Sequence, residues 1–329
     1  MKAQMARLAR LLVALTVLLA PAAQKSGAQE LPSRTIRMVV AFPAGGPADF
    51  VARLLADKLK SLIGQTVIVD NRAGANGAIG AEYVTRAEPD GATLFLTTVG
   101  AVAITPHLVA KVAYDPIRDF APITLVVRNT TILVVKPDVP VASARELAAL
   151  AARDPGALAI ASTGNGSMPH LALELYQASA KVKFLHVPYR GAAAALSDLL
   201  GGQVQGMFAD TSFLLSQIQG GKVRPLGAAS ANRNAALPDV PTLAEQGFPG
   251  FSAYAWWGIL APAGTSKAIL DKFHAELVKV LDQPDLRKQL TETLGMDLAV
   301  SSPEALQKFV VGEIDRWGKV VRDNNVRAD

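Results

Sequence analysis

Short apolar runs alternate with segments of helical periodicity, and this alternation limits the fold of the chain more than any other feature. Residues 36–42 (Ile-Arg-Met-Val-Val-Ala-Phe) predict a buried strand, and apolar residues at helical spacing from Phe50 to Leu62 predict a helix. The next predicted elements are a strand at 66–69, a helix at 78–87 and a strand at 93–97. Strand–helix–strand alternation predicts an α/β fold, with a parallel sheet covered by helices on both faces.

The same alternation restarts in the middle of the chain. Ser143, followed three residues later by Glu146, predicts a capping box that begins a helix ending near residue 153. Further strands are predicted at 132–135, 158–161, 184–187, 205–208 and 223–229, and further helices at 266–281, 284–294 and 303–322. Because no flexible linker separates the halves, we expect two compact lobes joined by extended segments, with a small-molecule cleft at their boundary.

The N-terminus has the three parts of a secretory signal peptide. Basic residues at 2, 7 and 10 precede an uncharged apolar run at 11–20, and Ser26-Gly27-Ala28 supplies small residues for a signal peptidase. The apolar run has about half of the roughly twenty residues that a bilayer-spanning helix needs. We therefore expect cleavage near Ala28 and a mature chain in the periplasm; the alternative is an uncleaved membrane anchor.

Composition excludes several classes of function. The net charge is +5, but residues 1–28 contain four of the 33 basic residues and no acidic one, which leaves 29 basic against 28 acidic residues, or +1. A nearly balanced chain gives no electrostatic reason to bind nucleic acid or an anionic membrane. The absence of cysteine excludes disulfides, thiolate nucleophiles and zinc sites built on sulfur.

Three glycine-rich loops follow predicted strands, at residues 42–49, 71–80 and 162–170. Glycine lets the backbone approach a ligand closely, and a helix N-terminus offers unpaired N–H groups, so the loops predict an anion site without lysine or arginine. Neither the P-loop nor the dinucleotide pattern is present, because no glycine pair precedes Lys-Ser or Lys-Thr and Pro169 interrupts the third loop. A carboxylate fits better than a phosphate; the alternative is that the loops are ordinary strand–helix turns.

Enzyme hypotheses have weaker support. Ser167, His170 and Asp210 could form a catalytic triad, but Ser167 lacks the Gly-x-Ser-x-Gly elbow. The four histidines form no zinc-binding pattern, so we expect neither a metal nor a cofactor. Trp256 and Trp257 lie in an apolar run and are predicted to pack in the core, with stacking on an aromatic or sugar ligand as the alternative.

Seven segments carry a family resemblance in order along the chain: residues 36–46 with Asp49, 71–80, 89–94, 114–120, 162–174, 186–191 and 198–204. Together they resemble the Bug family, the TctC-like substrate-binding receptors of tripartite tricarboxylate transporters. The resemblance covers the whole predicted mature chain. It implies a two-lobe periplasmic-binding-protein fold of the second type, with a ligand cleft between lobes, and no enzymatic activity.

The resemblance also implies boundaries, partners and a site. Lobe I would comprise residues 29–127 and 251–329, and lobe II residues 128–250. A monomer would capture a small carboxylate (an aliphatic di- or tricarboxylate, an amino acid or an aromatic acid) by hinge closure and deliver it to membrane permease subunits. The alternatives are a periplasmic sensing subunit or a Ser/His hydrolase. The predicted ligand-binding residues are Phe42, Pro43, Ala44, Gly45, Gly46, Asp49, Thr98, Thr163, Gly164, Asn165, Gly166, Ser167, His170 and Asp210.

Overall fold

The computed structural model describes residues 31–109, 112–324 and 326–327, so the predicted signal peptide lies outside the described residues. The strands are β1 (Ile36–Val40), β2 (Val67–Asn71), β3 (Thr93–Thr98), β4 (Phe120–Val135), β5 (Ala159–Ser162), β6 (Leu185–Pro188), β7 (Gly206–Asp210), β8 (Arg224–Ala228), β9 (Tyr254–Pro262) and β10 (Asp297–Leu298). The α-helices are α2 (Pro47–Ile63), α3 (Ala78–Thr85), α4 (Thr105–Leu108), α5 (Ala144–Ala151), α6 (Met168–Ala180), α7 (Ala192–Gly201), α8 (Thr211–Gln219), α9 (Lys267–Leu281), α10 (Pro284–Lys288) and α11 (Pro303–Asp323). Three short 3₁₀ or π turns complete the list: η1 (Ala75–Gly77), η2 (Gly100–Ile104) and η3 (Gln289–Thr293).

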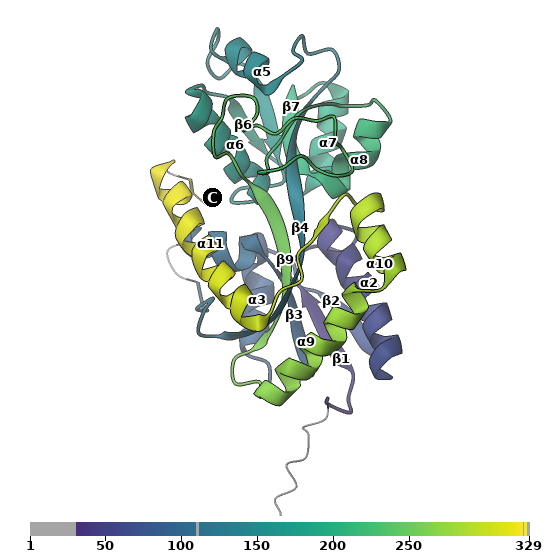
Figure 1. The fold of residues 1–329 in the computed structure, drawn as a ribbon. Helices are drawn as coiled ribbons and strands as arrows, with labels where there is room; N and C mark the ends of the chain where they lie inside the picture. Colours follow the sequence, from purple (N-terminus) through teal and green to yellow (C-terminus); the bar gives the residue numbers. More distant parts are fainter. Residues whose placement is uncertain (1–30, 110–111, 325, 328–329) are drawn as a thin grey trace, which may run out of the picture. The chain divides into compact units, whose positions relative to one another are not determined.

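The described strands pair in the order β2-β1-β3-β9-β4-β7-β5-β6, with β8 and β10 also pairing with β4. Strands β1, β2 and β3 are parallel to one another, and so are β5, β6 and β7. Strands β4 and β9 run antiparallel to each other between these two sets (Figure 1). The predicted α/β class and two-lobe fold are confirmed, but the expectation of a parallel sheet is wrong for β4 and β9, since an apolar run does not encode strand direction.

Strand β4 is much longer than its sequence pattern indicated. The prediction covered residues 132–135, whereas the strand begins at Phe120 and has 16 residues. Strand β9 was not predicted at all, although the burial of Trp256 and Trp257 within it is confirmed. Both strands are buried along most of their length, and this removes the polar–apolar alternation by which a half-exposed strand is recognised.

Serine caps begin several helices where the sequence predicted them. The Ser143 hydroxyl accepts a hydrogen bond from the Glu146 amide at 3.1 Å, and the Glu146 carboxylate accepts one from the amide of Ala142 at 2.7 Å. The reciprocal bond of the capping box is therefore made one residue earlier than expected. Ser302 caps α11, and Pro303 is its first residue, so the helix begins where the prediction of a helix at 303–322 placed it. The helix predicted at 284–294 is interrupted, because α10 ends at Lys288 and a π turn follows.

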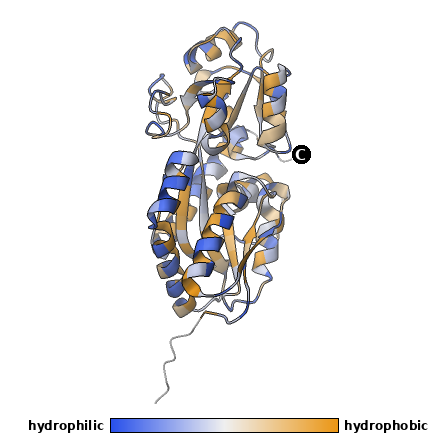
Figure 2. Cartoon of the chain, turned by 90° about the vertical axis from the view of Figure 1, so that its right-hand side faces the viewer, coloured by the Kyte–Doolittle hydropathy of each residue, from blue (hydrophilic) through white to orange (hydrophobic). Residues whose placement is uncertain are grey.

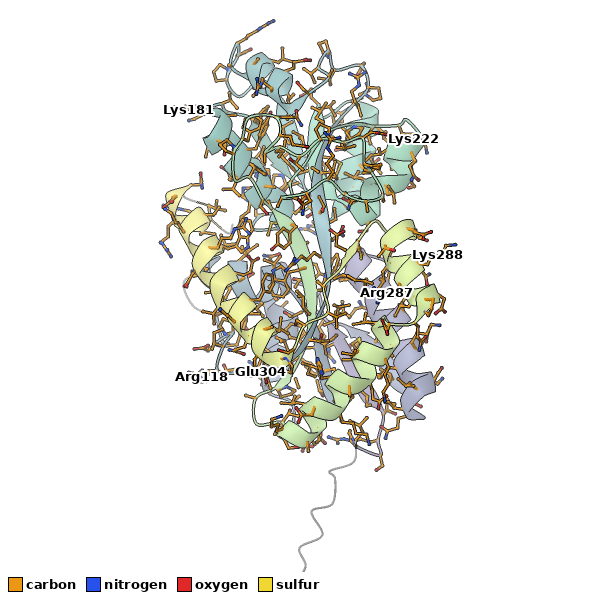
Figure 3. The ribbon with its side chains drawn as sticks, viewed as in Figure 1. Arg118, Lys181, Lys222, Arg287, Lys288 and Glu304 are labelled. Atoms are coloured by element: carbon orange, nitrogen blue, oxygen red, sulfur yellow. The ribbon has the colours of Figure 1, made fainter. Side chains whose placement is uncertain are left out.

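Most charged residues lie on the periphery and most large apolar residues in the interior. In Figure 2 the strands are mostly orange, and the surrounding helices show blue on their outer sides. Figure 3 labels six exposed charged side chains at the outer edge, which are Arg118, Lys181, Lys222, Arg287, Lys288 and Glu304. Within the described part of the chain, no helix is both long enough and apolar enough to cross a membrane.

A buried carboxylate fastens the last helix to the central strands. Glu313 of α11 is 5% exposed, and its Oε2 accepts hydrogen bonds of 2.9 Å from the indole nitrogens of both Trp256 and Trp317. Arg316 lies 3.3 Å from the other carboxylate oxygen. Both indoles are fully buried, so Glu313 supplies the acceptor that each N–H group needs in an apolar surrounding.

We expect Glu313→Leu to lower the free energy of unfolding by about 2–5 kcal/mol, because two buried indole N–H groups lose their acceptor. Glu313→Gln keeps an amide oxygen as acceptor and should lose clearly less. Urea unfolding followed by tryptophan fluorescence measures both variants, with the exposed Glu292→Leu as control. Equal losses for the Leu and Gln variants would contradict this role.

Candidate functional site

The two parallel strand sets point their carboxyl ends at each other across the middle of β4. Thr98, at the end of β3, pairs with Trp257 of β9, and Trp257 in turn pairs with Val127 of β4. Asp210, at the end of β7, pairs with Thr131 of β4. Val127 and Thr131 are four residues apart, or about 13 Å along an extended strand. Ligands of open α/β sheets bind outside the carboxyl ends of strands, and here two such edges face one another.

The first glycine-rich loop connects β1 to α2. Gly45 has a φ of +80°, a conformation that glycine adopts without strain, and Gly46 is the residue directly before the helix. The Gly45 amide donates to Asp49 Oδ2 at 2.9 Å, and the Asn71 side chain donates to the carbonyl of Phe42 at 3.1 Å. The loop is therefore held in shape by groups from α2 and β2.

Asp49 belongs to the support of this loop. It is 4% exposed, and Arg53 lies 2.9 Å from its Oδ1. Burial opposes ionisation of Asp49, but hydrogen bonds from Arg53, the Gly45 amide and Asn71 outweigh it and lower the pKa of this carboxyl. Asp49 Oδ2 accepts hydrogen bonds from Gly45 and Arg53, and Oδ1 faces Arg53 as an ion pair, so this carboxylate shapes the loop from inside the protein.

The third glycine-rich loop, residues 163–167, connects β5 to α6. Gly164 and Gly166 have φ values of +133° and +71°, and Ser167 caps the helix by accepting from the His170 amide. The Ser167 hydroxyl itself donates to the carbonyl of Gly164 at 2.7 Å. Thr163, Gly164, Asn165 and Ser167 are partly exposed, whereas Gly166 is buried. Since β5 and β7 are parallel neighbours, this loop and Asp210 lie at the same edge of the sheet.

The triad considered as an enzyme alternative, Ser167, His170 and Asp210, lacks its central hydrogen bond. The ring of His170 accepts a 3.0 Å hydrogen bond from the Gly166 amide and faces Glu174 at 3.5 Å, while the Ser167 hydroxyl is directed to a carbonyl. A different serine has the geometry of a nucleophile with its base, since Ser162 Oγ lies 2.7 Å from His186 Nε2. Ser162 is 0% exposed, however, so this hydroxyl is closed to a substrate.

Asn76, in the second glycine-rich loop, was not predicted as a site residue. Its side-chain amide donates to the carbonyl of Gly166 at 2.8 Å and to Thr105 Oγ1 at 3.2 Å. It thereby joins the loop after β2 to the loop after β5, 90 residues away in the chain. The signal available in the sequence was an asparagine inside a glycine-rich loop. Its φ of +47° and its partner across the fold were visible only in the structure.

Two predicted site residues at the facing strand ends carry buried polar atoms without a hydrogen-bond partner. Thr98 Oγ1 and Asp210 Oδ1 are both inaccessible to solvent and make no hydrogen bond in the described structure. Burial raises the pKa of Asp210 to about 7, against a smaller lowering by the neighbouring Thr131 side chain. Buried polar atoms without a hydrogen-bond partner are rare in proteins. A ligand bound at the facing edges would supply a partner to Thr98 Oγ1 and Asp210 Oδ1.

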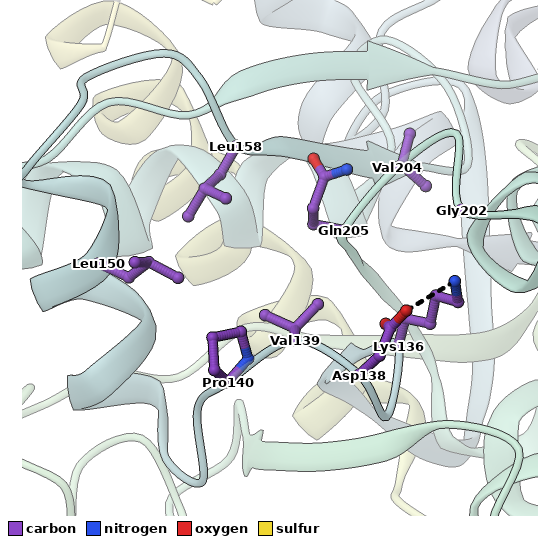
Figure 4. Close-up of a pocket in the computed structure, with 9 residues that line it drawn as sticks. All are labelled: Lys136, Asp138, Val139, Pro140, Leu150, Leu158, Gly202, Val204 and Gln205. Atoms are coloured by element: carbon purple, nitrogen blue, oxygen red, sulfur yellow. Dashed lines mark ion pairs between the residues drawn. The ribbon is translucent and has the colours of Figure 1, made fainter.

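A cavity of about 210 Å³ lies elsewhere, at the far end of β4 (Figure 4). It is lined by Lys136, Asp138, Val139, Pro140, Leu150, Leu158, Gly202, Val204 and Gln205, none of which is a predicted site residue. Its volume is below the range of about 300–1,000 Å³ typical of small-molecule sites. We therefore place the candidate site at the facing strand ends, where Thr98 and Asp210 have polar atoms without a hydrogen-bond partner, and not at this cavity. Among the described residues, no cluster of three His, Asp or Glu side chains could hold a metal ion.

The fold and the facing strand ends define a two-lobe solute-binding protein. Residues 51–326 match the model of the tripartite tricarboxylate transporter family receptor (TctC), and the chain belongs to this family. This confirms the resemblance to TctC-like Bug receptors.

Two curated relatives extend over nearly the whole chain. The UPF0065 protein in the tcbD-tcbE intergenic region of Pseudomonas sp. strain P51 is 38% identical, with 99% of this chain and 97% of the relative covered. BugT of Bordetella pertussis is 33% identical, with 97% and 98% covered. The region matched by the family model, residues 51–326, includes the predicted site residues from Thr98 to Asp210. The first glycine-rich loop, at residues 42–49, precedes this region.

Three solved structures share the fold. The periplasmic binding protein BugD superimposes with a TM-score of 0.82 at 36% identity, covering 91% of this chain and 100% of BugD. Rpa4515 of R. palustris with adipate gives 0.85 at 33% identity, covering 91% and 99%. MatC of Rhodopseudomonas palustris with bound malate gives 0.80 at 35% identity, covering 88% and 99%.

The pKa of Asp210 predicts how stability depends on pH. Its ordinary value of 3.8 applies to the unfolded chain and about 7 to the folded one, so between these values the folded state binds more protons and stability falls as pH rises. We expect Asp210→Asn to remove this loss and to raise the melting temperature of the ligand-free protein at about pH 8. Melting curves between about pH 4 and pH 8 measure it, and an unchanged pH dependence in the variant would contradict the assignment.

Proposed function

We propose that this protein captures a small carboxylated solute between the loops after β1 and β5 and presents it to the membrane permease subunits of a tripartite tricarboxylate transporter. The observation that carries the proposal is the meeting of two parallel strand ends across β4, with orphaned polar atoms of Thr98 and Asp210 on either side. Membership of the receptor family, and relatives whose structures hold adipate and malate, support the ligand class and the transport role.

The chemistry of the site suits a carboxylate that is bound without a formal positive charge. Helices α2 and α6 begin directly after the two loops. Pro47 and Pro169 have no N–H group, and Ser167 caps the amide of His170. The first-turn amides of Ala48, Asp49 and Met168 therefore remain without a partner inside their helices. These amides and the positive end of each helix dipole attract an anion. Asp210 Oδ1 and the neighbouring Thr131 hydroxyl both lack a hydrogen-bond partner, so a hydroxyl or amine group of the ligand would find a donor and an acceptor here in addition to the site for its carboxylate.

Lobe closure follows from the same topology. We place lobe I at residues 29–127 and 251–329 and lobe II at residues 128–250, so that the chain crosses between the lobes in β4 and just before β9. Hinge closure on a bound solute belongs to the known repertoire of periplasmic binding proteins. Export by the predicted signal peptide and a periplasmic location agree with the periplasmic origin of BugD. We expect a monomer that acts as a receptor and not as an enzyme.

A panel of carboxylic acids tests the proposal directly. Malate, adipate, amino acids, tricarboxylates and aromatic acids are added to the purified mature chain, and melting temperature and ligand recovery are measured. A ligand at a hundred times its Kd stabilises the native state by about 2.7 kcal/mol, which raises the melting temperature by a few degrees. No shift with any acid would contradict carboxylate capture. Turnover of an ester substrate that disappears in Ser167→Ala would support the hydrolase alternative.

Substitution of Gly45 tests the first loop against a matched control. Gly45 and Gly221 both have a positive φ and open space around an added Cβ, so alanine at either position adds backbone strain and no clash. We expect Gly45→Ala and Gly221→Ala to lose similar stability, whereas only Gly45→Ala weakens binding of the acid found in the panel, by about tenfold or more. Calorimetric titration measures the affinity. Equal affinities in both variants would place the ligand away from this loop.

Substitutions in the third loop test the opposite side of the site. We expect Thr163→Ala and Ser167→Ala each to weaken ligand binding by about 1–2 kcal/mol, the scale of a lost hydrogen bond. Ser167→Ala also removes the cap of α6, so its unfolding free energy should fall by about 1 kcal/mol, whereas Thr163→Ala leaves stability nearly unchanged. Calorimetry and urea unfolding separate the two effects. Unaltered affinity in both variants would move the site elsewhere.

A further inference from the structure

A stacked pair of imidazoles lies beneath the third glycine-rich loop. The rings of His170 and His186 are 3.9 Å apart between centroids and inclined by 11°. His170 lies in the first turn of α6 and is 6% exposed, and His186 lies on the neighbouring strand β6. The stack therefore connects the start of the helix to the edge of the sheet at the point where the loop leaves β5.

His170 holds one amide of the loop. The Gly166 N–H group donates to His170 Nδ1 at 3.0 Å, which requires Nδ1 to be unprotonated and the ring proton to lie on Nε2. Glu174 Oε1, 3.5 Å from Nε2, favours this tautomer. Protonation of Nδ1 would place two donors face to face and break the bond to Gly166.

His186 holds the other end of the loop through Ser162. His186 Nε2 lies 2.7 Å from Ser162 Oγ, and the Gly164 amide donates to the same hydroxyl oxygen at 3.3 Å. Ser162 Oγ also lies 3.3 Å from the Gly164 carbonyl. The hydroxyl can therefore donate to His186 when Nε2 is unprotonated, and must turn to that carbonyl when Nε2 carries a proton. Burial, and then the charge of His170, lower the pKa of His186 to about 4, so the neutral ring persists well below neutral pH.

We propose that Ser162, His170 and His186 are positioning residues for the ligand loop, and that protonation of His186 turns the Ser162 hydroxyl toward the Gly164 carbonyl, changes the hydrogen bond to the Gly164 amide and weakens ligand capture. Glu174 on α6 is the charged side chain in contact with the stack among the described residues. The effect on ligand capture rests on the proposed function, whereas the positioning of the two amides does not.

The sign of the pH effect follows from the neutral state of His186. Its ordinary pKa of 6.5 applies to the unfolded chain, so between 6.5 and about 4 the unfolded state binds more protons than the folded one. The contribution of neutral His186 to the stability of the folded state is complete above pH 6.5, and it is lost as the pH falls from 6.5 through about 4. The pH dependence is opposite in direction to that of Asp210, so single variants of the two residues separate the contributions.

Nuclear magnetic resonance of the ligand-free protein tests the positioning. Histidine rings and the Gly164 and Gly166 amides are followed from about pH 8 to pH 4 in the wild type, in His186→Gln and in His274→Gln. Glutamine places an acceptor near the position of Nε2 but does not titrate, and His274 bonds to the Ser301 carbonyl, outside the loop. We expect the Gly164 amide to move with His186 in the wild type and in His274→Gln, and to lose that response in His186→Gln. A His186 that titrates near 6.5, or a Gly164 amide that never moves, would overturn the proposal.

Binding of malate and adipate as probes tests the consequence. We expect His186→Gln to keep the wild-type affinity near neutral pH and to lose less affinity than the wild type on acidification, whereas His186→Phe is weaker by about fivefold already near neutral pH. Because the wild type and the variants are compared at the same pH, the ionisation of the probe affects all of them equally and cancels. Identical pH profiles for the wild type and His186→Gln would refute the acid response. Failure of the wild type to bind either probe would count against the proposed ligand class, and the resonance experiment would still decide the positioning.

Discussion

The pairing of β4 with β9 is the constraint on which the rest of the structure depends. These two antiparallel strands lie between two sets of parallel strands, and their register decides that the carboxyl ends of β3 and β7 face each other. The loops after β1, β3, β5 and β7 then converge on the middle of β4. A slip of one residue would turn every side chain of the slipped strand to the opposite face of the sheet, so the packing against both buried faces of β4 also holds the geometry of the site.

Buried charged side chains support the structure at two places. Asp49 is neutralised by Arg53 and shapes the loop after β1, while Glu313 satisfies two buried indoles and fastens α11. The loop after β5 relies on neutral partners, namely two histidines, a serine and the side chain of Asn76.

Sequence reasoning identified the loops but not their supports. The glycine pattern was sufficient to select residues 42–49 and 162–170, because a positive φ and a helix start depend on local chemistry. Asn76, Thr131 and His186 gave weaker signals, since each acts through a partner more than twenty residues away in the chain. Ser167, His170 and Asp210 suggested a triad by residue type alone, whereas their hydrogen bonds show a helix cap, a loop anchor and a buried carboxyl.

The amino-acid sequence by itself determined the α/β class, the positions of most helices, their serine caps and the resemblance to TctC-like receptors. These features depend on periodicity and on chemistry within a few residues. The tertiary structure alone decided the antiparallel direction of β4 and β9, the full length of β4 and the contact between Asn76 and Gly166. A completely buried strand carries no alternation to reveal its length or direction, and a hydrogen bond across 90 residues depends on the packing of elements that have no local signature.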